Sequence, residues 1–391
     1  MKTTYPANIA KGYAYSFFSW FGITGLWVMY LQTKGLNLVE IGLCESIFHV
    51  ASFIFEVPSG VLADRFSYRF DLFWGRIAAI VSALIILFGQ SFWLFALGFV
   101  LSALSYNLQS GTIDALLYDS LITTNLVNHY PKVASNVDII IEFADTAGVV
   151  IAGFLVHWHF ELTYVIAILV GIFGIVTVIL FKEPRVKQPT DTAQPQTIKS
   201  ITVSAYHVLK DNHQLRDLML FDALFGAICT TYYYYFQSLM EANRFSGWMI
   251  SSLMILSALV NIAGIRLTPK IQAAFSKRLL IFGLSCSLVA LLLLSWVNWQ
   301  PLLISLFLIS QLLAALITPI FSNYYNTMIA SQQRATLLSV ANVLFSLTMI
   351  ITFPLVGWLI QVNSFSVAFG LIGIAVLVIL VGTRKAFEWQ Q

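Results

Sequence analysis

The sequence predicts an all-α integral membrane protein with twelve transmembrane helices in two pseudo-symmetric six-helix bundles. Three observations predict this fold class: the composition, the spacing of apolar segments and the placement of basic residues. Of the 391 residues, 59% are hydrophobic and only 10% are charged, whereas about 25% are charged in a typical globular protein. A soluble protein could not hide so much apolar surface. We therefore expect a multi-pass protein of the cell membrane.

Long apolar segments mark the candidate spans, because one crossing needs about 20 mostly apolar residues. The first half holds the segments 12–32, 39–62, 71–90, 92–118, 136–158 and 160–182. The second half holds the segments 216–238, 246–268, 279–297, 301–323, 336–360 and 364–384. The polar, proline-containing stretch between the halves predicts a cytoplasmic linker. The expected domains are residues 1–182, 183–215 and 216–391.

The basic residues test this topology independently, because cytoplasmic loops are enriched in Lys and Arg. With both termini in the cytoplasm, only Lys34 and Arg244 of the 21 basic residues fall on the outer side. The other 19 fall on or near the inner side. A missing span would scatter this asymmetry, so the charge pattern supports twelve spans.

The composition and the absence of certain motifs argue against several classes of function. The net charge of +3 is too small to indicate nucleic-acid binding. The three cysteines lie apart in apolar segments, so we expect neither a metal site nor a cofactor. No phosphate-binding loop and no nucleophile–base pair is apparent, which argues against ATP hydrolysis and against an enzyme. The expected partners are a small-molecule substrate, protons and the lipid bilayer, and we expect a monomer.

The loop after the second expected span carries a distinctive motif, GVLADRFSYR. It combines a carboxylate at the membrane surface with basic side chains. The string resembles the signature loop of the major facilitator superfamily, G-x-L-a-D-r-x-G-r-r, which lies between the second and third helices of that family. The matching residues are Gly60, Leu62, Ala63, Asp64, Arg65 and Arg69, and the departures are Ser67 and Tyr68.

This resemblance covers the whole chain and implies a secondary transporter that works by alternating access, with substrate between the two halves. It also implies a gating role for the loop, because in this family the signature Asp approaches the start of the eleventh helix. A carboxylate is stabilised at such a helix end. The segments 55–60 and 110–121 resemble a branch of bacterial facilitators that is associated with efflux. Two features of drug–proton antiporters are absent: an Arg in the fourth span and a Gly-Pro pair in the fifth.

Acidic residues inside a membrane are costly and mark functional candidates. The expected spans contain Glu45, Glu56, Asp114, Asp138, Glu142, Asp145 and Asp222, and we assign no acid to the third, sixth, ninth or twelfth span. Asp138, Glu142 and Asp145 are spaced by four and three residues, so they share one helix face. Asp145 lies roughly 14 Å from the cytoplasmic end of its span. A carboxyl group at this depth can exchange a proton when its hydration changes.

We therefore predict that Asp145 is the proton-coupling residue and that Glu142 assists it, whereas Asp138 ends in a hydrated vestibule. Glu56 and Asp114 lie about two turns from the inner ends of their spans and are predicted to belong to the gate. Glu45 and Asp222 lie near helix ends, where solvated positions are expected.

Aromatic and amide side chains supply the candidate substrate cavity. Four consecutive tyrosines, 232–235, surround the whole circumference of the seventh span, so at most two of them can face a cavity. The predicted cavity residues are Tyr106, Asn107, Gln109, Tyr232, Tyr233 and Gln311.

Carboxylates beside an aromatic-rich cavity favour lipophilic or cationic substrates. Proton-coupled efflux of such molecules is the function that we predict. The alternatives are proton-coupled or facilitated transport of a small metabolite, such as a sugar or an organic acid, and lipid flipping.

Overall fold

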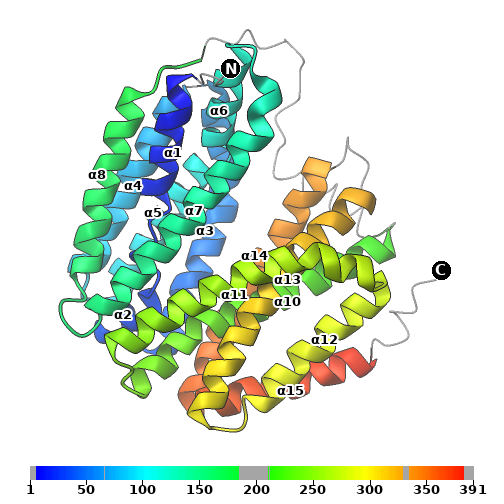
Figure 1. The fold of residues 1–391 in the computed structure, drawn as a ribbon. Coiled ribbons are helices and arrows are strands. Elements are labelled where there is room, and N and C mark those ends of the chain that lie inside the picture. The colour runs from blue at the N-terminus through cyan, green and yellow to red at the C-terminus, as the bar shows by residue number, and fades with distance from the viewer. Residues whose placement is uncertain (1–5, 66, 185–209, 211, 329–333, 383–391) are drawn as a thin grey trace. The chain divides into compact units, whose positions relative to one another are not determined.

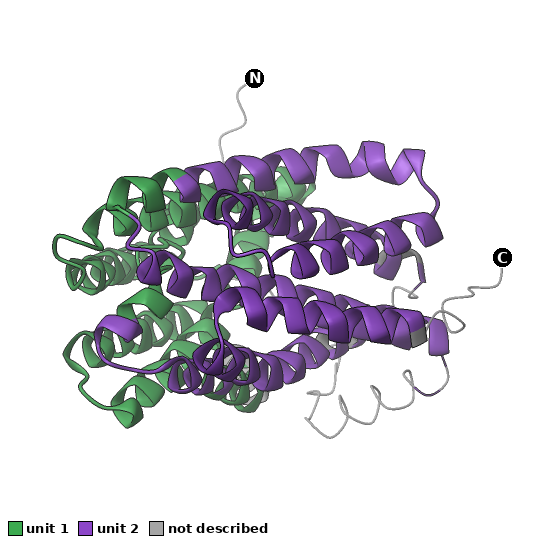
Figure 2. Ribbon diagram, turned by 90° about the horizontal axis from the view of Figure 1, so that it is seen from below, with its two compact units in different colours: residues 1–30, 47–197, 246–252 green, residues 31–46, 198–245, 253–391 purple. Residues whose placement is uncertain are grey.

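The computed structural model describes residues 6–65, 67–184, 210, 212–328 and 334–382. The described chain is built from helices joined by short turns and contains no strand (Figure 1), which confirms the all-α prediction. Figure 2 colours its two compact units. The first unit is Met1–Tyr30, Ile47–Thr197 and Ser246–Ser252, and the second is Leu31–Ser46, Ile198–Phe245 and Leu253–Gln391. Most of the expected linker lies outside the described residues, so the division into 1–182, 183–215 and 216–391 stays a prediction.

The first unit contains most of the helices of the N-terminal half. These are α1 (Ala7–Ser19), α4 (Tyr68–Phe88), α5 (Phe92–Gln109), α6 (Thr112–Ile122), η1 (Val127–His129), α7 (Tyr130–Leu155) and α8 (Leu162–Leu180). Two further helices, α2 (Trp27–Thr33) and α3 (Leu38–Arg65), cross from one unit into the other. Part of the core is a cluster of buried side chains from α1, α4, α6, α7 and α8 and from the residue after α8: Ile9, Tyr15, Leu72, Leu116, Leu117, Leu121, Val133, Val137, Val178 and Phe181.

Two expected spans are interrupted, and glycine lies at both interruptions. The first expected span becomes α1 and α2, separated by the segment 20–26 with its two glycines. The fourth expected span becomes α5 and α6, and Gly111 between them has φ of 74°. Side chains disfavour this left-handed conformation and glycine does not. Interrupted helices in transporters frequently surround binding sites, because their ends present free backbone groups.

The second unit contains most of the helices of the C-terminal half. These are α10 (His213–Ala242), α12 (Lys277–Leu294), α13 (Gln300–Met328), α14 (Arg334–Val362) and α15 (Phe365–Gly382). The remaining helix, α11 (Gly247–Ala274), begins in the first unit and continues into the second. The start of α10 is capped by Asn212, whose side-chain oxygen accepts from the Leu215 amide at 3.0 Å. Ser276 caps α12 in the same way. Side-chain oxygens at these positions satisfy amides that have no partner inside the helix.

A proline inside α14 is compensated by a side chain of α3. Pro354 has no amide hydrogen, so the carbonyl of Ile350 loses its helical donor. The hydroxyl of Ser46 lies 2.8 Å from this carbonyl oxygen and donates to it. Gly42 packs directly on Pro354 and makes this approach possible. All of these residues belong to the second unit, and they satisfy a backbone group that would be costly to leave unpaired in lipid.

Eight segments of the described chain are helical, long and apolar enough to cross a membrane. They are Leu38–Glu56, Tyr68–Phe88, Phe92–Ile122, Leu162–Leu180, Gly247–Ala274, Lys277–Leu294, Gln300–Tyr325 and Val340–Val362. A shorter apolar helix spans Phe365–Val381. The other expected spans correspond to the interrupted α1–α2 segment and to the acid-bearing α7 and α10. The number twelve therefore stays a prediction.

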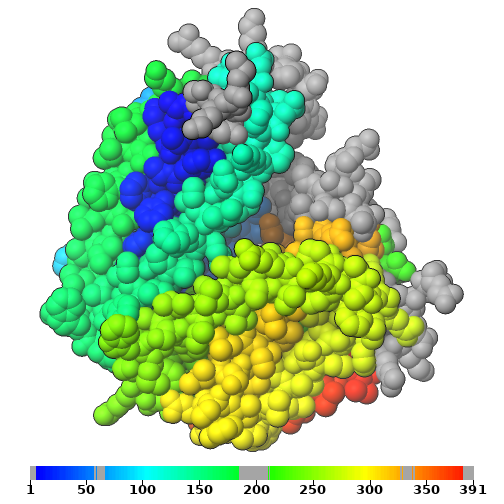
Figure 3. Space-filling view, in the orientation of Figure 1, coloured from blue at the N-terminus to red at the C-terminus, as the bar shows by residue number. Residues whose placement is uncertain are grey.

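Large apolar side chains cover the outer surfaces of several helices, as lipid contact requires. On α8, Phe173 is 55% exposed and Ile179 is 56% exposed. On α12, Leu279 and Phe282 are exposed to a similar degree; this helix is yellow in Figure 3. Apolar surface of this extent would be unstable in water, so these helix faces are suited to a bilayer.

Candidate functional site

The predicted acidic face of α7 is exposed along its length. Asp138, Glu142 and Asp145 are all exposed, whereas Ala144 and Gly148 on another side of the helix are buried. No ion-pair or hydrogen-bond partner is found for the three carboxylates among the described residues. Charged groups are not stable against hydrocarbon. This face of α7 therefore contributes to a water-accessible surface of the first unit.

The carboxylate of Asp145 lies against the interrupted first span. A side chain added at Gly22 would collide with Oδ1 and the carbonyl of Asp145. A side chain added at Gly148 would meet the backbone of Gly22, with its Cβ 2.5 Å from the amide nitrogen. The Gly22 amide donates to the Ala144 carbonyl oxygen at 3.4 Å. Two glycines thus allow backbone-to-backbone packing, which places the Asp145 carboxylate beside the interruption between α1 and α2.

A second acidic position lies where α6 and α7 meet in the first unit. Asp114 is exposed in the first turn of α6, and Asp138 is exposed on α7. The rings of Tyr118 and Tyr130 pack edge to face nearby, with centroids 5.0 Å apart. Charged carboxylates are not stable against hydrocarbon, so this position contributes to a water-accessible surface of the first unit.

The signature loop is described only in part. The backbone of Gly60, Asp64 and Arg65 belongs to α3, but their side chains lie outside the described part of the structure. Glu56, one turn earlier, is exposed. The guanidinium of Arg69 donates to the Ile179 carbonyl oxygen at 2.9 Å.

The motif departure at Tyr68 has a structural role that the sequence did not reveal. The Tyr68 hydroxyl donates to Asp119 Oδ2 at 2.8 Å, and its amide donates to Glu183 Oε1 at 2.8 Å. Glu183 therefore places a carboxylate at the N-terminus of α4, where the helix dipole favours negative charge. Together these bonds connect the start of α4 to α6 and to the end of the N-terminal half.

A buried arginine inside the first unit was not expected from the sequence. Arg76 was counted among the cytoplasmic-side basic residues, but it is 4% exposed and lies two turns into α4. Its Nη2 donates to Gln109 Oε1 at 2.7 Å, and its guanidinium lies 5.7 Å from the centroid of the Tyr15 ring. The arginine therefore joins α1, α4 and the end of α5, next to the interruption at Gly111.

An acidic residue also lies in the third expected span, contrary to the assignment made from the sequence. Asp71 is fully buried in the first turn of α4, and neither carboxylate oxygen has a hydrogen-bond partner among the described residues. The residue was missed because it is the first residue of the expected span. A buried carboxyl group without partners costs less free energy when it is neutral, so Asp71 is a further candidate for proton exchange.

The predicted cavity residues of the fourth span occupy different environments. Tyr106 is 42% exposed, and its ring packs edge to face with Trp20. Asn107 donates to the Ser52 hydroxyl at 2.8 Å. Gln109 is buried and accepts from Arg76. In this arrangement only Tyr106 offers much side-chain surface to a ligand.

The tyrosine run on α10 is packed mainly inside the second unit. Tyr232 is fully buried against Phe369, and its hydroxyl lies 3.1 Å from Ser295 Oγ. Tyr233 is half-buried and stacks on Phe307 at 5.8 Å. Gln311 is also half-buried, and its amide donates to Ser310 Oγ. Of these residues, Tyr233 and Gln311 retain surface that a ligand could reach.

A cavity of about 420 Å³ lies in the second unit between α10, α13 and α14. Asp222 lines it, and one of its carboxylate oxygens, Oδ2, accepts from the Tyr325 hydroxyl at 2.8 Å. Phe321, Phe345 and Asn342 contribute to the same lining. The sequence predicts a solvated helix end for Asp222, whereas the structure places it in the lining of this cavity. Its position within an expected span is the signal that identifies it as a functional candidate.

No group of three or more potential metal-ligating side chains is found in the part of the chain that the structure describes.

Comparison with known proteins gives concordant results. The sequence profile of the Major Facilitator Superfamily matches residues 9–310. An uncharacterized MFS-type transporter, YxaM of Bacillus subtilis (strain 168), is 31% identical over 114 residues, which are 29% of this chain and 27% of that protein. The aligned region thus spans about a quarter of that relative.

Solved structures share the fold at low sequence identity. The nucleoside transporter NupG is 15% identical with a TM-score of 0.76, covering 98% of this chain and 100% of that one. A peptide transporter POT, in complex with sulfate, is 13% identical with a TM-score of 0.70, covering 98% and 95%. A D-xylose-proton symporter is 13% identical with a TM-score of 0.63, covering 95% of each chain. The chain belongs to the Major Facilitator Superfamily and is a membrane transporter.

Proposed function

We propose that this transporter is a proton-coupled secondary active transporter that exports small lipophilic or cationic molecules by alternating access. The observation that carries the proposal is the position of Asp145. It is an exposed carboxylate on α7, which corresponds to the fifth expected span, and it packs against the glycine backbone between α1 and α2. Interrupted helices supply free backbone groups that can bind ions or polar groups of a substrate.

The carboxylates along α7 support a proton route from the cytoplasmic side of the helix. Asp138, Glu142 and Asp145 follow one another at intervals of about one helical turn, roughly 5 Å each. Each is exposed and can take up a proton from water. We propose that Asp145 carries the coupled proton and that Glu142 passes protons to it.

The substrate class follows from the balance of charge on the accessible surfaces. The candidate positions of both units carry carboxylates, namely Asp114, Glu142, Asp145 and Asp222. Aromatic side chains accompany them, including Tyr106 in the first unit and Phe321 in the second. Carboxylates attract cations, and aromatic faces attract them further.

The second candidate function is proton symport of a small polar metabolite. Proteins that share the fold include a nucleoside transporter and a D-xylose-proton symporter. Symport and export make opposite predictions in vesicles. An exporter accumulates substrate on the side from which protons leave, whereas a symporter moves both in the same direction.

The test uses purified protein in proteoliposomes with an imposed pH gradient and a library of labelled compounds. Asp145→Asn should abolish accumulation driven by the pH gradient and retain exchange of substrate down its own gradient. Glu142→Gln should slow accumulation without abolishing it. Asp217→Asn on α10 is the matched control, because the Asp217 carboxylate is paired with Arg216 and lies outside this route, and it should behave like the wild type. Proton-driven accumulation by Asp145→Asn at the wild-type rate would refute the assignment.

A further inference from the structure

The cavity of the second unit has the size and composition of a small-molecule site. Its volume of about 420 Å³ lies within the range of roughly 300–1,000 Å³ that is usual for ligand pockets. Asp222 lies nine residues after the first residue of α10, about 14 Å along the helix axis. The cavity therefore lies well inside the helix bundle of this unit. Thr318, Ser322 and Asn342 line it and are exposed, so it is accessible from one side.

A single acidic side chain gives the lining of the cavity its negative charge. Among the described residues that line it, Asp222 is the only acidic side chain and none is basic. The other polar groups are hydroxyls, one thiol and one amide. The carboxylate therefore has no counter-ion in the cavity lining, which favours the entry of a cation.

One oxygen of this carboxylate is left available. Tyr325 is 4% exposed, and its hydroxyl donates to Oδ2 of Asp222 at 2.8 Å. This bond fixes the carboxylate, because the tyrosine ring is packed in the core. Oδ1 has no hydrogen-bond partner among the described residues, and Asp222 is half-buried and lines the cavity. A ligand can therefore bind Oδ1 without displacing Tyr325.

Aromatic rings form two other parts of the lining. Phe321 is buried and stacks on Phe221, with centroids 5.6 Å apart and planes inclined by 13°. Phe345 lies beside Gly226, where an added Cβ would be 3.4 Å from the phenylalanine ring. The space beside Gly226 exists because this residue has no side chain. A carboxylate together with aromatic rings is a recurrent environment for organic ammonium groups.

We propose that this cavity binds the positive group of an organic monocation, with Asp222 Oδ1 as its counter-ion and the rings of Phe321 and Phe345 against its apolar part. The proposal rests on the proposed export of lipophilic cations, and it assigns the cationic substrate group to the second unit.

The test is equilibrium binding of labelled benzyltrimethylammonium to the purified full-length protein at constant ionic strength. Wild-type protein should bind it saturably, and the uncharged carbon analogue neopentylbenzene should compete at least tenfold less well. Asp222→Asn should weaken binding at least tenfold, because it keeps the shape of the side chain and removes its charge. Gly226→Leu should also weaken binding at least tenfold, because the new side chain fills the cavity beside Phe345.

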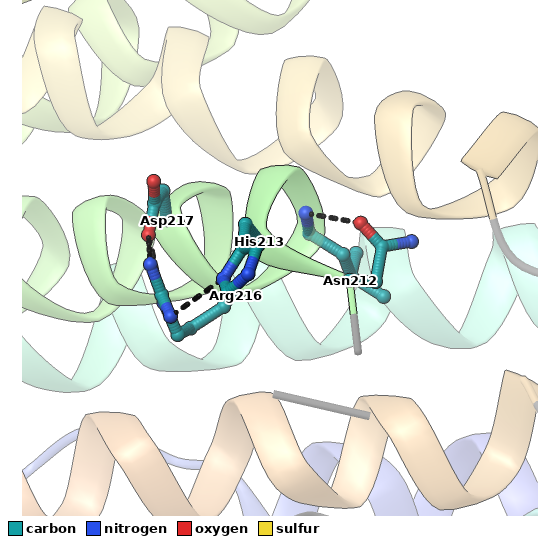
Figure 4. A network of polar contacts seen from close by, with 5 residues as sticks. Asn212, His213, Arg216 and Asp217 are labelled. Atoms are coloured by element: carbon teal, nitrogen blue, oxygen red, sulfur yellow. Dashed lines mark hydrogen bonds and ion pairs between the residues drawn. The ribbon is translucent and has the colours of Figure 1, made fainter. Parts of the chain in front are cut away.

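The matched control is Asp217→Asn. Asp217 is an acidic residue of the same helix, but it is paired with Arg216 at 2.8 Å and is not part of the lining. Figure 4 shows this pair together with His213 and the capping residue Asn212. The control variant should bind the cation within twofold of the wild type.

Each alternative outcome has a distinct meaning. Equal binding by wild type and Asp222→Asn, or no saturable binding by the wild type, would overturn the proposed site. Displacement of the label by equimolar Na⁺ would also overturn it, because the site would then select an inorganic ion. Proton-driven transport in proteoliposomes is measured separately. Its presence without cation binding refutes only the site, and its absence alongside cation binding refutes only the proton coupling.

Discussion

The contact between Gly148 and the interrupted first span can be tested by a single methyl group. In Gly148→Ala, the new Cβ would lie 2.5 Å from the amide nitrogen and 2.6 Å from the carbonyl carbon of Gly22. Ordinary contacts of a Cβ begin near 3.4 Å, so the two backbones must separate by about 1 Å. Overpacking of this kind costs about 1–3 kcal/mol. We expect the upper end of that range, because backbone atoms cannot rotate away.

Gly283→Ala on α12 is the matched control. No atom lies within 4 Å of the Cβ that it would introduce, and alanine in a helix is more favourable than glycine by about 0.5–1 kcal/mol. The two variants should therefore differ by about 2–4 kcal/mol in the free energy of unfolding. The assay is thermal unfolding of the purified protein in detergent, followed by size-exclusion chromatography with fluorescence detection. Gly148→Ala should also slow proton-driven transport, because separation of the backbones moves Asp145 away from Gly22. Equal stability of the two variants would refute the close packing.

Three further changes test other parts of the molecule. Ser46→Ala should destabilise the protein by about 1–2 kcal/mol, because the Ile350 carbonyl, which Pro354 leaves without a helical donor, also loses the Ser46 hydroxyl. The control Ser305→Ala is exposed and should not change stability. Equal midpoints of thermal unfolding for the two variants would argue against this compensation. Tyr235→Phe removes a hydroxyl that donates to the buried carbonyl oxygens of Phe353 and Leu38, at 2.9 and 3.1 Å. The free energy of unfolding should fall by about 1–3 kcal/mol, and an unchanged thermal unfolding curve would contradict this expectation. Asp64→Asn should lower the transport rate at least tenfold with normal folded yield, and transport at the wild-type rate in proteoliposomes would limit the signature loop to a topological role.

Much of the fold follows from local patterns in the sequence. Apolar length marks the helices, because each span must satisfy its own backbone and expose apolar side chains to lipid. The spacing of Asp138, Glu142 and Asp145 placed all three on one helix face, and the structure shows them exposed together. The interruptions were not predicted. Glycines such as Gly22 and Gly111 are common in continuous transmembrane helices as well.

The environments of individual charged residues could not be predicted, because they depend on partners that are distant in the sequence. Arg76 is held by Gln109, 33 residues later, and Asp222 by Tyr325, 103 residues later. Depth along a span was the only criterion available from the sequence. By this criterion Arg76 is predicted at the cytoplasmic side and Asp222 at a solvated helix end. In the structure each side chain is instead held by a partner on a neighbouring helix.

The presence of an acidic site in each unit leads to a final prediction about the charge moved per cycle. If Asp222 binds the organic monocation as its counter-ion and Asp145 carries the one coupled proton in the opposite direction, the cycle moves no net charge. Proton-driven export by the wild type should therefore be insensitive to a potassium–valinomycin potential. In Asp145→Asn the cation would move without a proton, so a membrane potential would contribute about 2.3 kcal/mol per 100 mV to its net movement. Net cation movement by Asp145→Asn should therefore follow the imposed potential. A wild-type export rate that depends on the potential would show that more than one proton is exchanged in each cycle.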